Sequence, residues 1–370
     1  MLSCLVGSEM CIRDRHTIMD SNVASLSGGG LYANASSSLK AFDSIVRNNS
    51  ALSENGGGMY MIIHTANGNA SALLSNLTFA DNRATAGAGG GIYRSGGVYV
   101  NVWNSSFWSN TGSEGGGLYL ANGSSNFANV SLISNHGVLY GGGLKVSGDE
   151  SLVMDSSSLK LNRAGKSGGG MYVGSAVQVQ GSNMLYSENL ASGSVEGGGA
   201  VYAEDGSLVS SVGDLYESNQ ATQGSGGGLY VSGLADVACS SCVLKNNTAY
   251  LHGGALYTES WKVSVTDDSV VMNNVAETGD GGGLYSSSST NLTLADVSFE
   301  ENKALGLNAS FGTFGRGGAV AFCSAIDFSL ENVFIRNNKA IYGGGVYSPA
   351  DTAVVIRHSI LDSNIASLSG

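Results

Sequence analysis

The stretch LYESNQATQGSGGGLY at residues 215–230 contains the two motifs that decide the fold of this 370-residue chain. The first motif is an apolar residue, two variable residues, Asn, one variable residue and a small residue, and here it runs from Tyr216 to Ala221. The second motif is two or three glycines, an apolar residue and Tyr, and here it ends at Tyr230. Both motifs recur along the chain at a fixed period, which is the signature of a solenoid.

The glycine motif occurs in twelve copies, of which two are degenerate and end in Lys145 and Ala321. The 315 residues from Tyr32 to Tyr347 span eleven intervals, so the repeat averages about 28.6 residues. Glycines supply positive φ and allow a close backbone approach before the next strand, and Tyr can stack on Tyr at a strand face. The ten complete copies end in Tyr32, Tyr60, Tyr93, Tyr119, Tyr172, Tyr202, Tyr230, Tyr257, Tyr285 and Tyr347.

The asparagine motif occurs in thirteen copies, always with an apolar residue three positions before the Asn and with Ala or Gly two positions after it. Asn tolerates the left-handed conformation that a sharp corner needs. Stacked on its copies, its amide can donate and accept hydrogen bonds along the axis. We therefore predict a structural ladder of Asn22, Asn49, Asn82, Asn110, Asn135, Asn162, Asn189, Asn219, Asn247, Asn274, Asn302, Asn338 and Asn364.

The spacing between the motifs shows which half of the repeat is rigid. The gap from the Tyr position to the next Asn is 17 residues in ten of twelve repeats, whereas the gap from Asn to the next Tyr position varies between 9 and 19. Insertions are tolerated in surface loops but not inside a stacked coil. The variable half therefore contains a loop, which is longest at Lys303–Gly318, where Phe311 and Phe314 stand among glycines.

The apolar pattern within a repeat indicates strands. Pairs such as Val177 and Val179, or Leu292 and Leu294, alternate with the period of two that is typical of a short strand. No window has a helical period of useful length. We predict an all-β fold, a right-handed parallel β-helix (a solenoid) of about 13 coils with roughly 28 residues and three short strands per coil.

Composition excludes several classes of protein. The chain has 56 glycines but one proline, which excludes collagen, and 42% of its residues are hydrophobic, which argues against disorder. With 17 basic and 29 acidic residues the net charge is −12, so nucleic acid is not an expected partner. No run of 18 apolar residues occurs, and we predict no direct membrane insertion by this segment.

The repeats divide the chain unequally. Residues 1–15, MLSCLVGSEMCIRDR, share nothing with the repeats and are predicted to be a non-native leader. Residues 16–370 are predicted to form a single β-helix domain. The segment Ser363–Gly370 nearly repeats Ser21–Gly28, and neither end has the polar cap that closes a solenoid. We therefore expect a fragment truncated at both ends.

The pair of motifs resembles the repeat of the chlamydial polymorphic outer membrane proteins, in which FxxN is followed by GGA and Ile, Leu or Val. Segments such as FADNRA, FEENKA and GGALY carry the likeness, which covers residues 16–370. The resemblance implies a right-handed, pectin-lyase-like β-helix on the cell surface with an adhesin role. Similar repeats occur in large surface proteins of aquatic microbial eukaryotes. It further implies an extracellular or cell-surface location (outer membrane if bacterial), and a host or cell-surface protein or glycan as partner.

Parallel β-helices also include polysaccharide lyases and glycoside hydrolases, which use clustered carboxylates. Asp267 and Asp268 form the only notable Asp pair, and Asp296 and Asp351 have no evident partners. We expect a solvated corner at Asp267, with no catalytic residue, cofactor or metal. The favoured function is a non-enzymatic adhesin-like or structural display scaffold, and the alternative is a lyase or hydrolase. An ice-binding solenoid would need a flat row of Thr, which the repeats lack.

A cysteine pair, an isolated aspartate and a set of sequons stand outside the repeat motifs. Cys239 and Cys242 form a CxxC in which a buried thiol pair or a local disulfide is favoured over zinc, because His252 is the only further ligand nearby. Asp280 lies beside three glycines but outside any calcium-binding repeat. In a secreting eukaryote, sequons could carry glycan. These candidates are Asn34, Asn69, Asn76, Asn104, Asn122, Asn129, Asn291 and Asn308, and Asn48 and Asn246 are sequons directly before a ladder Asn.

Overall fold

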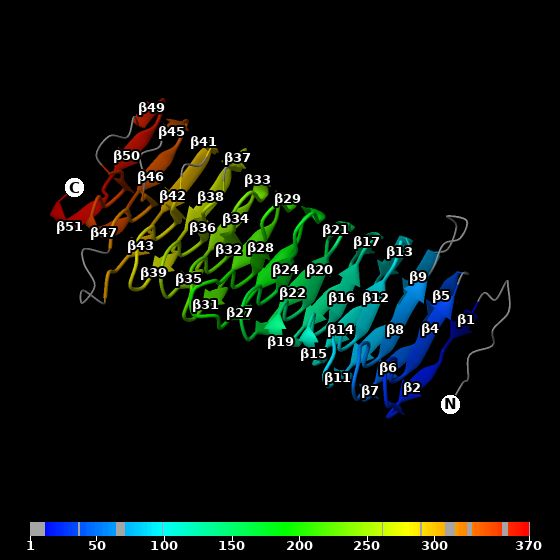
Figure 1. The fold of residues 1–370 in the computed structure, drawn as a ribbon. Helices are drawn as coiled ribbons and strands as arrows, with labels where there is room; N and C mark the ends of the chain where they lie inside the picture. The colour runs from blue at the N-terminus through cyan, green and yellow to red at the C-terminus, as the bar shows by residue number, and fades with distance from the viewer. Residues whose placement is uncertain are drawn as a thin grey trace. The chain divides into compact units, whose positions relative to one another are not determined.

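A computed structural model describes residues 12–35, 38–63, 71–97, 99–260, 262–288, 291–307, 315–323, 328–349 and 354–369. The chain divides into two compact units, the first formed by residues 1–165 and 169–179 and the second by residues 166–168 and 180–370. Each unit is a stack of parallel β coils (Figure 1). The described residues contain no helix that is long and apolar enough to cross a membrane.

Each coil of unit 1 contributes one strand to each of four parallel sheets, A to D. Sheet A contains β1 (Ile12–Arg15), β5 (Leu39–Phe42), β9 (Ser71–Ser75), β13 (Tyr99–Trp103), β17 (Ser124–Ala128) and β21 (Ser151–Asp155). Sheet B contains β2 (Ile18–Asp20), β6 (Ile45–Arg47), β10 (Thr78–Ala80), β14 (Ser106–Trp108), β18 (Ser131–Ile133) and β22 (Ser158–Lys160). Sheet C contains β3 (Val23–Ala24), β7 (Ser50–Ala51), β11 (Arg83–Ala84), β15 (Thr111–Glu114), β19 (His136–Tyr140) and β23 (Arg163–Ala164). Sheet D contains β4 (Leu31–Ala35), β8 (Met59–Ile63), β12 (Ile92–Ser95), β16 (Leu118–Ala121), β20 (Leu144–Ser147) and β24 (Met171–Val173).

Unit 2 repeats the arrangement, and β25 (Gln178–Ser182) contains the boundary between the units. Its sheet A contains β29 (Leu208–Val212), β33 (Asp236–Ser240), β37 (Lys262–Thr266), β41 (Asn291–Ala295), β45 (Phe328–Glu331) and β49 (Val354–Arg357). Sheet B contains β26 (Leu185–Ser187), β30 (Leu215–Glu217), β34 (Val243–Lys245), β38 (Ser269–Met272), β42 (Val297–Glu300), β46 (Phe334–Arg336) and β50 (Ile360–Asp362). Sheet C contains β27 (Leu190–Ala191), β31 (Gln220–Ala221), β35 (Thr248–Ala249), β39 (Val275–Ala276), β43 (Lys303–Ala304), β47 (Lys339–Tyr342) and β51 (Ile365–Ser369). Sheet D contains β28 (Val201–Ala203), β32 (Leu229–Val231), β36 (Leu256–Thr258), β40 (Leu284–Ser286), β44 (Val320–Phe322) and β48 (Val346–Tyr347).

The register of the strands places like residues on top of one another. In unit 1, Tyr93 pairs with Tyr60 on one side and Tyr119 on the other. In unit 2, Tyr202 pairs with Tyr230, 28 residues later. The all-β parallel solenoid with a repeat of about 28 residues is therefore confirmed.

The core of each unit consists of columns of like side chains. Phe79 and Phe107, three residues before their ladder asparagines, are fully buried and stacked with ring centroids 4.8 Å apart. Tyr186 and Tyr216 stack in the same way at 4.6 Å in unit 2. Burying a large apolar side chain contributes about 1.5–3 kcal/mol, so these columns are a main source of stability.

One prediction about the elements is wrong. Each coil has four strands rather than three, because the apolar residue and Tyr after the glycines also pair between coils and because some sheet C strands, such as β3, have only two residues. Such short pieces show no alternation in sequence. Ile12–Arg15, which belong to the predicted leader, form β1 and pair in parallel with β5, and the non-native origin of residues 1–15 stays a prediction. That residues 16–370 form a single domain stays a prediction.

The glycines act at one corner of the coil, as predicted. Gly226, the first glycine of its motif, has φ of +68°, a left-handed conformation that costs glycine nothing. At the next position a Cβ on Gly227 would lie 2.4 Å from the carbonyl oxygen of Gly254. Only a residue without a side chain fits there.

The asparagine corner differs from the prediction in one respect. The left-handed residue is the one before the ladder Asn, for example Asn48 (φ 56°), Leu161 (φ 56°) and Ser218 (φ 57°), whereas no ladder Asn has positive φ. The predicted left-handed conformation of the ladder asparagines is therefore wrong. The chain reverses one residue earlier, and the Asn that follows directs its amide along the interior.

Candidate functional site

The asparagines form ladders in the interior of both units. In unit 2, the backbone N–H and Nδ2 of Asn247 both donate to Oδ1 of Asn274, at 2.9 and 3.0 Å. Its Nδ2 also donates to the Tyr216 carbonyl at 2.9 Å, and its Oδ1 accepts two bonds from Asn219. Since all polar atoms of this buried side chain are used within the fold, the ladder has no capacity left for a ligand.

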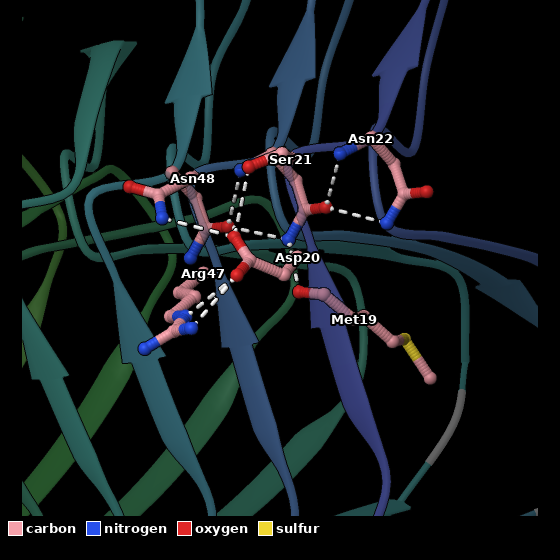
Figure 2. A network of polar contacts seen from close by, with 8 residues as sticks. Met19, Asp20, Ser21, Asn22, Arg47 and Asn48 are labelled. Atoms are coloured by element: carbon pink, nitrogen blue, oxygen red, sulfur yellow. Dashed lines mark hydrogen bonds and ion pairs between the residues drawn. The ribbon is translucent and has the colours of Figure 1, made fainter.

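Unit 1 has the same ladder, which begins at Asn22 (Figure 2). The backbone N–H and Nδ2 of Asn82 donate to Oδ1 of Asn110 at 3.0 and 2.9 Å, and its Nδ2 donates to the Val46 carbonyl at 2.8 Å. The same contacts recur through Asn162.

Beside the first rung of this ladder, charges on adjacent coils form pairs at the surface (Figure 2). Asp20 Oδ2 accepts hydrogen bonds from Arg47 Nε and Nη2, at 3.0 and 2.8 Å, and its Oδ1 accepts one from Asn48 Nδ2 at 2.9 Å. Hydrogen bonds from Asn48, Arg47 and Ser21 lower the pKa of Asp20 to about 2. The carboxylate is ionised and engaged, which suits a link between coils better than acid–base chemistry.

The Asp pair considered for catalysis lies at a solvent-exposed corner. Asp267 and Asp268 both have positive φ, and Asp296 stands at the same corner one coil further along. Asp267 Oδ2 accepts hydrogen bonds from Ser240 at 2.6 Å and Thr266 at 2.9 Å, and these bonds lower the pKa of the carboxyl. Such an acid is poorly suited to protonate a leaving group at neutral pH. Asp351 lies outside the described residues.

Asp280 is engaged in an ion pair. Its Oδ2 accepts hydrogen bonds from Arg316 Nη2 at 2.8 Å and Nε at 3.1 Å, and its Oδ1 accepts one from the Arg316 backbone at 2.8 Å. The Asp280 N–H donates to Nδ1 of His252, whose ring stacks on Tyr285 at 4.4 Å. Burial lowers the pKa of His252. In the described part of the chain, no three His, Cys, Asp or Glu side chains are placed to hold a metal ion.

The CxxC cysteines are buried free thiols. The pKa of Cys239 is raised by its hydrogen bond with Cys242 and by burial. A raised pKa keeps the thiol protonated, which disfavours both nucleophilic reactivity and zinc binding, because both need the thiolate. Cys242 Sγ lies 3.5 Å from the carbonyl oxygens of Ser211 and Ser240. Of the two readings left open above, the structure has the thiol pair.

A buried carboxylate that sequence reasoning missed lies in the same region of unit 2. Asp214 Oδ1 accepts the Met184 N–H at 2.9 Å, while its Oδ2 has no hydrogen-bond partner among the described residues. Burial raises its pKa to about 6. Nearby, the hydroxyls of Ser211 and Tyr216 lie 2.7 Å apart. The available signal was the spacing, since Asp214 stands five residues before a ladder Asn, a position that is uncharged in every other coil.

Unit 1 contains a second unforeseen feature, a fully buried ion pair. Arg94 Nη1 donates to Glu150 Oε2 and to the Ala121 carbonyl, both at 2.8 Å, and Nη2 bonds to Glu150 Oε1 and Ser125. In the register of sheet D, Arg94 pairs with Met61 and Leu120, which are buried apolar residues. The sequence signal for this ion pair was Arg94 itself, a charged residue at a repeat position that is apolar in the adjacent coils.

The sequons lie mainly at exposed corners. Asn76, Asn104 and Asn129 occupy the same left-handed corner of successive coils, and Asn122 lies at another. Asn34 is exposed in β4. Asn69 and Asn308 lie outside the described residues, as do Phe311 and Phe314 of the long loop, and only the backbone of Asn291 is described.

Comparison with known proteins adds no relative. No protein-family model, curated protein or solved structure matches this chain.

Proposed function

We propose that this chain is a non-enzymatic extracellular or cell-surface β-helix segment that serves as an adhesin-like or structural display scaffold. The observation that supports this proposal is that the buried polar side chains of the coils form their hydrogen bonds within the fold. The ladder asparagines and the Arg94–Glu150 pair bond to neighbouring coils. On the outer face of sheet A the exposed first residue of the strand differs from coil to coil, as at Tyr99, Leu208 and Lys262.

The carboxylates at the Asp267 corner support the same reading. A glycosidase needs a carboxylic acid with a raised pKa beside a second carboxylate. Asp267 instead accepts two hydroxyl hydrogen bonds that keep it ionised. We propose a host or cell-surface protein or glycan as the partner of the outer faces.

The proposal is tested by measuring turnover and surface binding together. The purified chain is incubated with oligogalacturonate, alginate and xylan while reducing ends and unsaturated products are followed, and its binding to intact cells is measured by flow cytometry. We expect saturable binding and no product, in the chain itself and in Asp268→Asn. Product release that Asp268→Asn abolishes would contradict the proposal and favour a polysaccharide lyase or hydrolase.

A further inference from the structure

Three large aromatic side chains are exposed on one coil of unit 1. Tyr99 and Trp103 are the first and last residues of β13, and Trp108 is the last residue of β14, which follows directly. They are 47%, 40% and 42% exposed, whereas Val102 and Phe107, which alternate with them, are buried. The buried residues hold both strands in place, so the three rings stand on a rigid surface.

The three rings differ from the tyrosines of sheet D. Those tyrosines cover one another, as at Tyr60 and Tyr93, whose rings stack 5.3 Å apart. In sheet A, Trp103 pairs with Ser75 and Ala128, and Tyr99 pairs with two serines. Trp108 in sheet B pairs with Ala80 and Ile133. Because no aromatic neighbour in the register covers these rings, their faces are open to a ligand.

Amide groups lie among the rings. Asn101 points outward between Tyr99 and Trp103 and pairs in the register with Asn126. Asn104 and Asn129 stand at the corner between the two sheets, where Asn129 Nδ2 donates to Asn104 Oδ1 at 2.9 Å. An aromatic face accepts the C–H side of a sugar ring, and an amide both donates to and accepts from hydroxyls. The surface therefore has both groups that a saccharide needs.

The strands that carry the rings, and the strands beside them, have no charged outward residue; the nearest charge is the exposed Asp81, directly after β10. None of the outward positions on β9, β13 and β17 of sheet A, or on β10, β14 and β18 of sheet B, is Asp, Glu, Lys or Arg, although the chain has 17 basic and 29 acidic residues. The three sheet A strands lie side by side in Figure 1. A neutral face offers nothing to the carboxylates of an acidic polymer, so it matches an uncharged ligand.

The area of the rings also bears on the kind of ligand. An aromatic side chain buries about 150–250 Å², so exposed fractions of 47%, 40% and 42% leave roughly 250 Å² in all. A stable protein interface takes about 800 Å² from each partner. The rings alone supply about a third of that area, which suits a few sugar units of an extended chain.

We propose that Tyr99, Trp103 and Trp108, with the amides of Asn101 and Asn126, form a binding surface for a neutral polysaccharide. The sugar rings lie against the aromatic faces, and their hydroxyls bond to the amides. This inference rests on the proposed display function and names one class of partner for it.

The test uses the full chain from a bacterial host, so that Asn104 carries no glycan. Binding to soluble mixed-linkage β-glucan, xylan, galactomannan and α-mannan is measured by affinity electrophoresis and by Trp fluorescence, with polygalacturonate as the acidic comparison. Trp103 and Trp108 are two of the three tryptophans, so fluorescence reports directly on the surface. The variants are Trp103→Ala with Trp108→Ala, and Asn101→Ala. The matched control is Phe334→Ala, which removes a 50% exposed ring from unit 2.

We expect at least one neutral polymer to bind, the double Trp variant to weaken binding at least tenfold, and Asn101→Ala to weaken it several-fold. Phe334→Ala should bind unchanged, and circular dichroism should confirm that every variant is folded. The inference is overturned if no neutral polymer binds, if polygalacturonate binds more tightly, or if Phe334→Ala has the same effect as the Trp variant. It is also overturned if, in the cell-binding assay described above, protease treatment of the cells abolishes the binding that depends on the rings, because the ligand would then be a protein. These failures leave the display function standing, because that function is tested by turnover and by binding to cells and does not depend on this class of ligand.

Discussion

Asn247 shows how much one consensus residue contributes to the coil. Its backbone and side chain donate three hydrogen bonds and its Oδ1 accepts two, all to residues of the neighbouring coils. Buried polar groups that lose their partners cost about 1–3 kcal/mol each. Each buried ladder Asn therefore requires an Asn at the same position of the neighbouring coils as its hydrogen-bond partner.

We expect Asn247→Ala to lower the free energy of unfolding by about 3–5 kcal/mol, because it leaves the Tyr216 carbonyl and two donors of Asn219 without partners. Urea unfolding followed by circular dichroism measures the effect. The control is Asn246→Gly, which keeps the positive φ of the exposed preceding residue and should change stability by less than about 0.5 kcal/mol. Equal effects of the two changes would contradict the role of the ladder.

Asp214 makes the stability of unit 2 depend on pH. Its folded pKa of about 6 lies above the ordinary value of 3.8, so the folded state binds the proton more tightly than the unfolded state. The contribution of Asp214 to stability is then highest below about pH 4 and falls as the pH rises through 6. We expect a loss of up to about 3 kcal/mol across this range, measured by urea unfolding at pH 4 and pH 7.5.

The matched variant is Asp214→Asn, which cannot ionise. We expect it to remove most of this pH dependence and to be more stable than the parent at pH 7.5. An unchanged pH profile in Asp214→Asn would show that another group is responsible.

At the scale of the element, the glycine corner depends on a missing Cβ. A Cβ on Gly227 would lie 2.4 Å from the Gly254 carbonyl oxygen and 2.6 Å from the backbone of Thr248, whereas a Cβ on Gly97 would meet nothing within 4 Å. We expect Gly227→Ala to cost about 3 kcal/mol or more and Gly97→Ala less than about 0.5 kcal/mol. Thermal unfolding of both variants distinguishes a packed corner from a merely flexible one, since flexibility alone predicts similar effects.

The Arg94–Glu150 pair links residues of three coils through their interior. Removing one partner of a buried pair costs about 3–5 kcal/mol, whereas replacing both with apolar residues is often neutral. We therefore expect Arg94→Met to be strongly destabilising and Arg94→Met with Glu150→Leu to recover most of the loss. A double variant no more stable than Arg94→Met would show that the pair itself is required.

At the scale of the whole molecule, each coil bonds to its neighbours, so a local change should have a local effect. We expect Asn247→Ala to increase amide hydrogen exchange in β30 to β39 of unit 2 and to leave β10 to β18 of unit 1 unchanged. Hydrogen-exchange mass spectrometry measures both regions in one experiment. Uniform loss of protection would instead mean that the chain unfolds as one cooperative block.

The fold class, the repeat and the stacked columns could be predicted because they are properties of each coil. A residue such as Phe79 or Tyr216 recurs at a constant distance from its ladder Asn, and parallel pairing then puts copies together. The ladder asparagines were named from the same periodicity. Their backbone conformation was not, since nothing in the motif shows which of two adjacent residues reverses the chain.

The repeat pattern of the sequence thus determined by itself that the coils stack with like residues in register, because each repeat contains both motifs at a nearly constant spacing. Only the tertiary structure decided which exceptions matter. Arg94 and Asp214 became buried charges, and Trp103 and Trp108 became uncovered rings, through the residues that neighbouring coils place beside them. Those neighbours are about 28 residues away in sequence, and Glu150 is 56 residues from Arg94, so their identity shapes a site only after the coils have stacked.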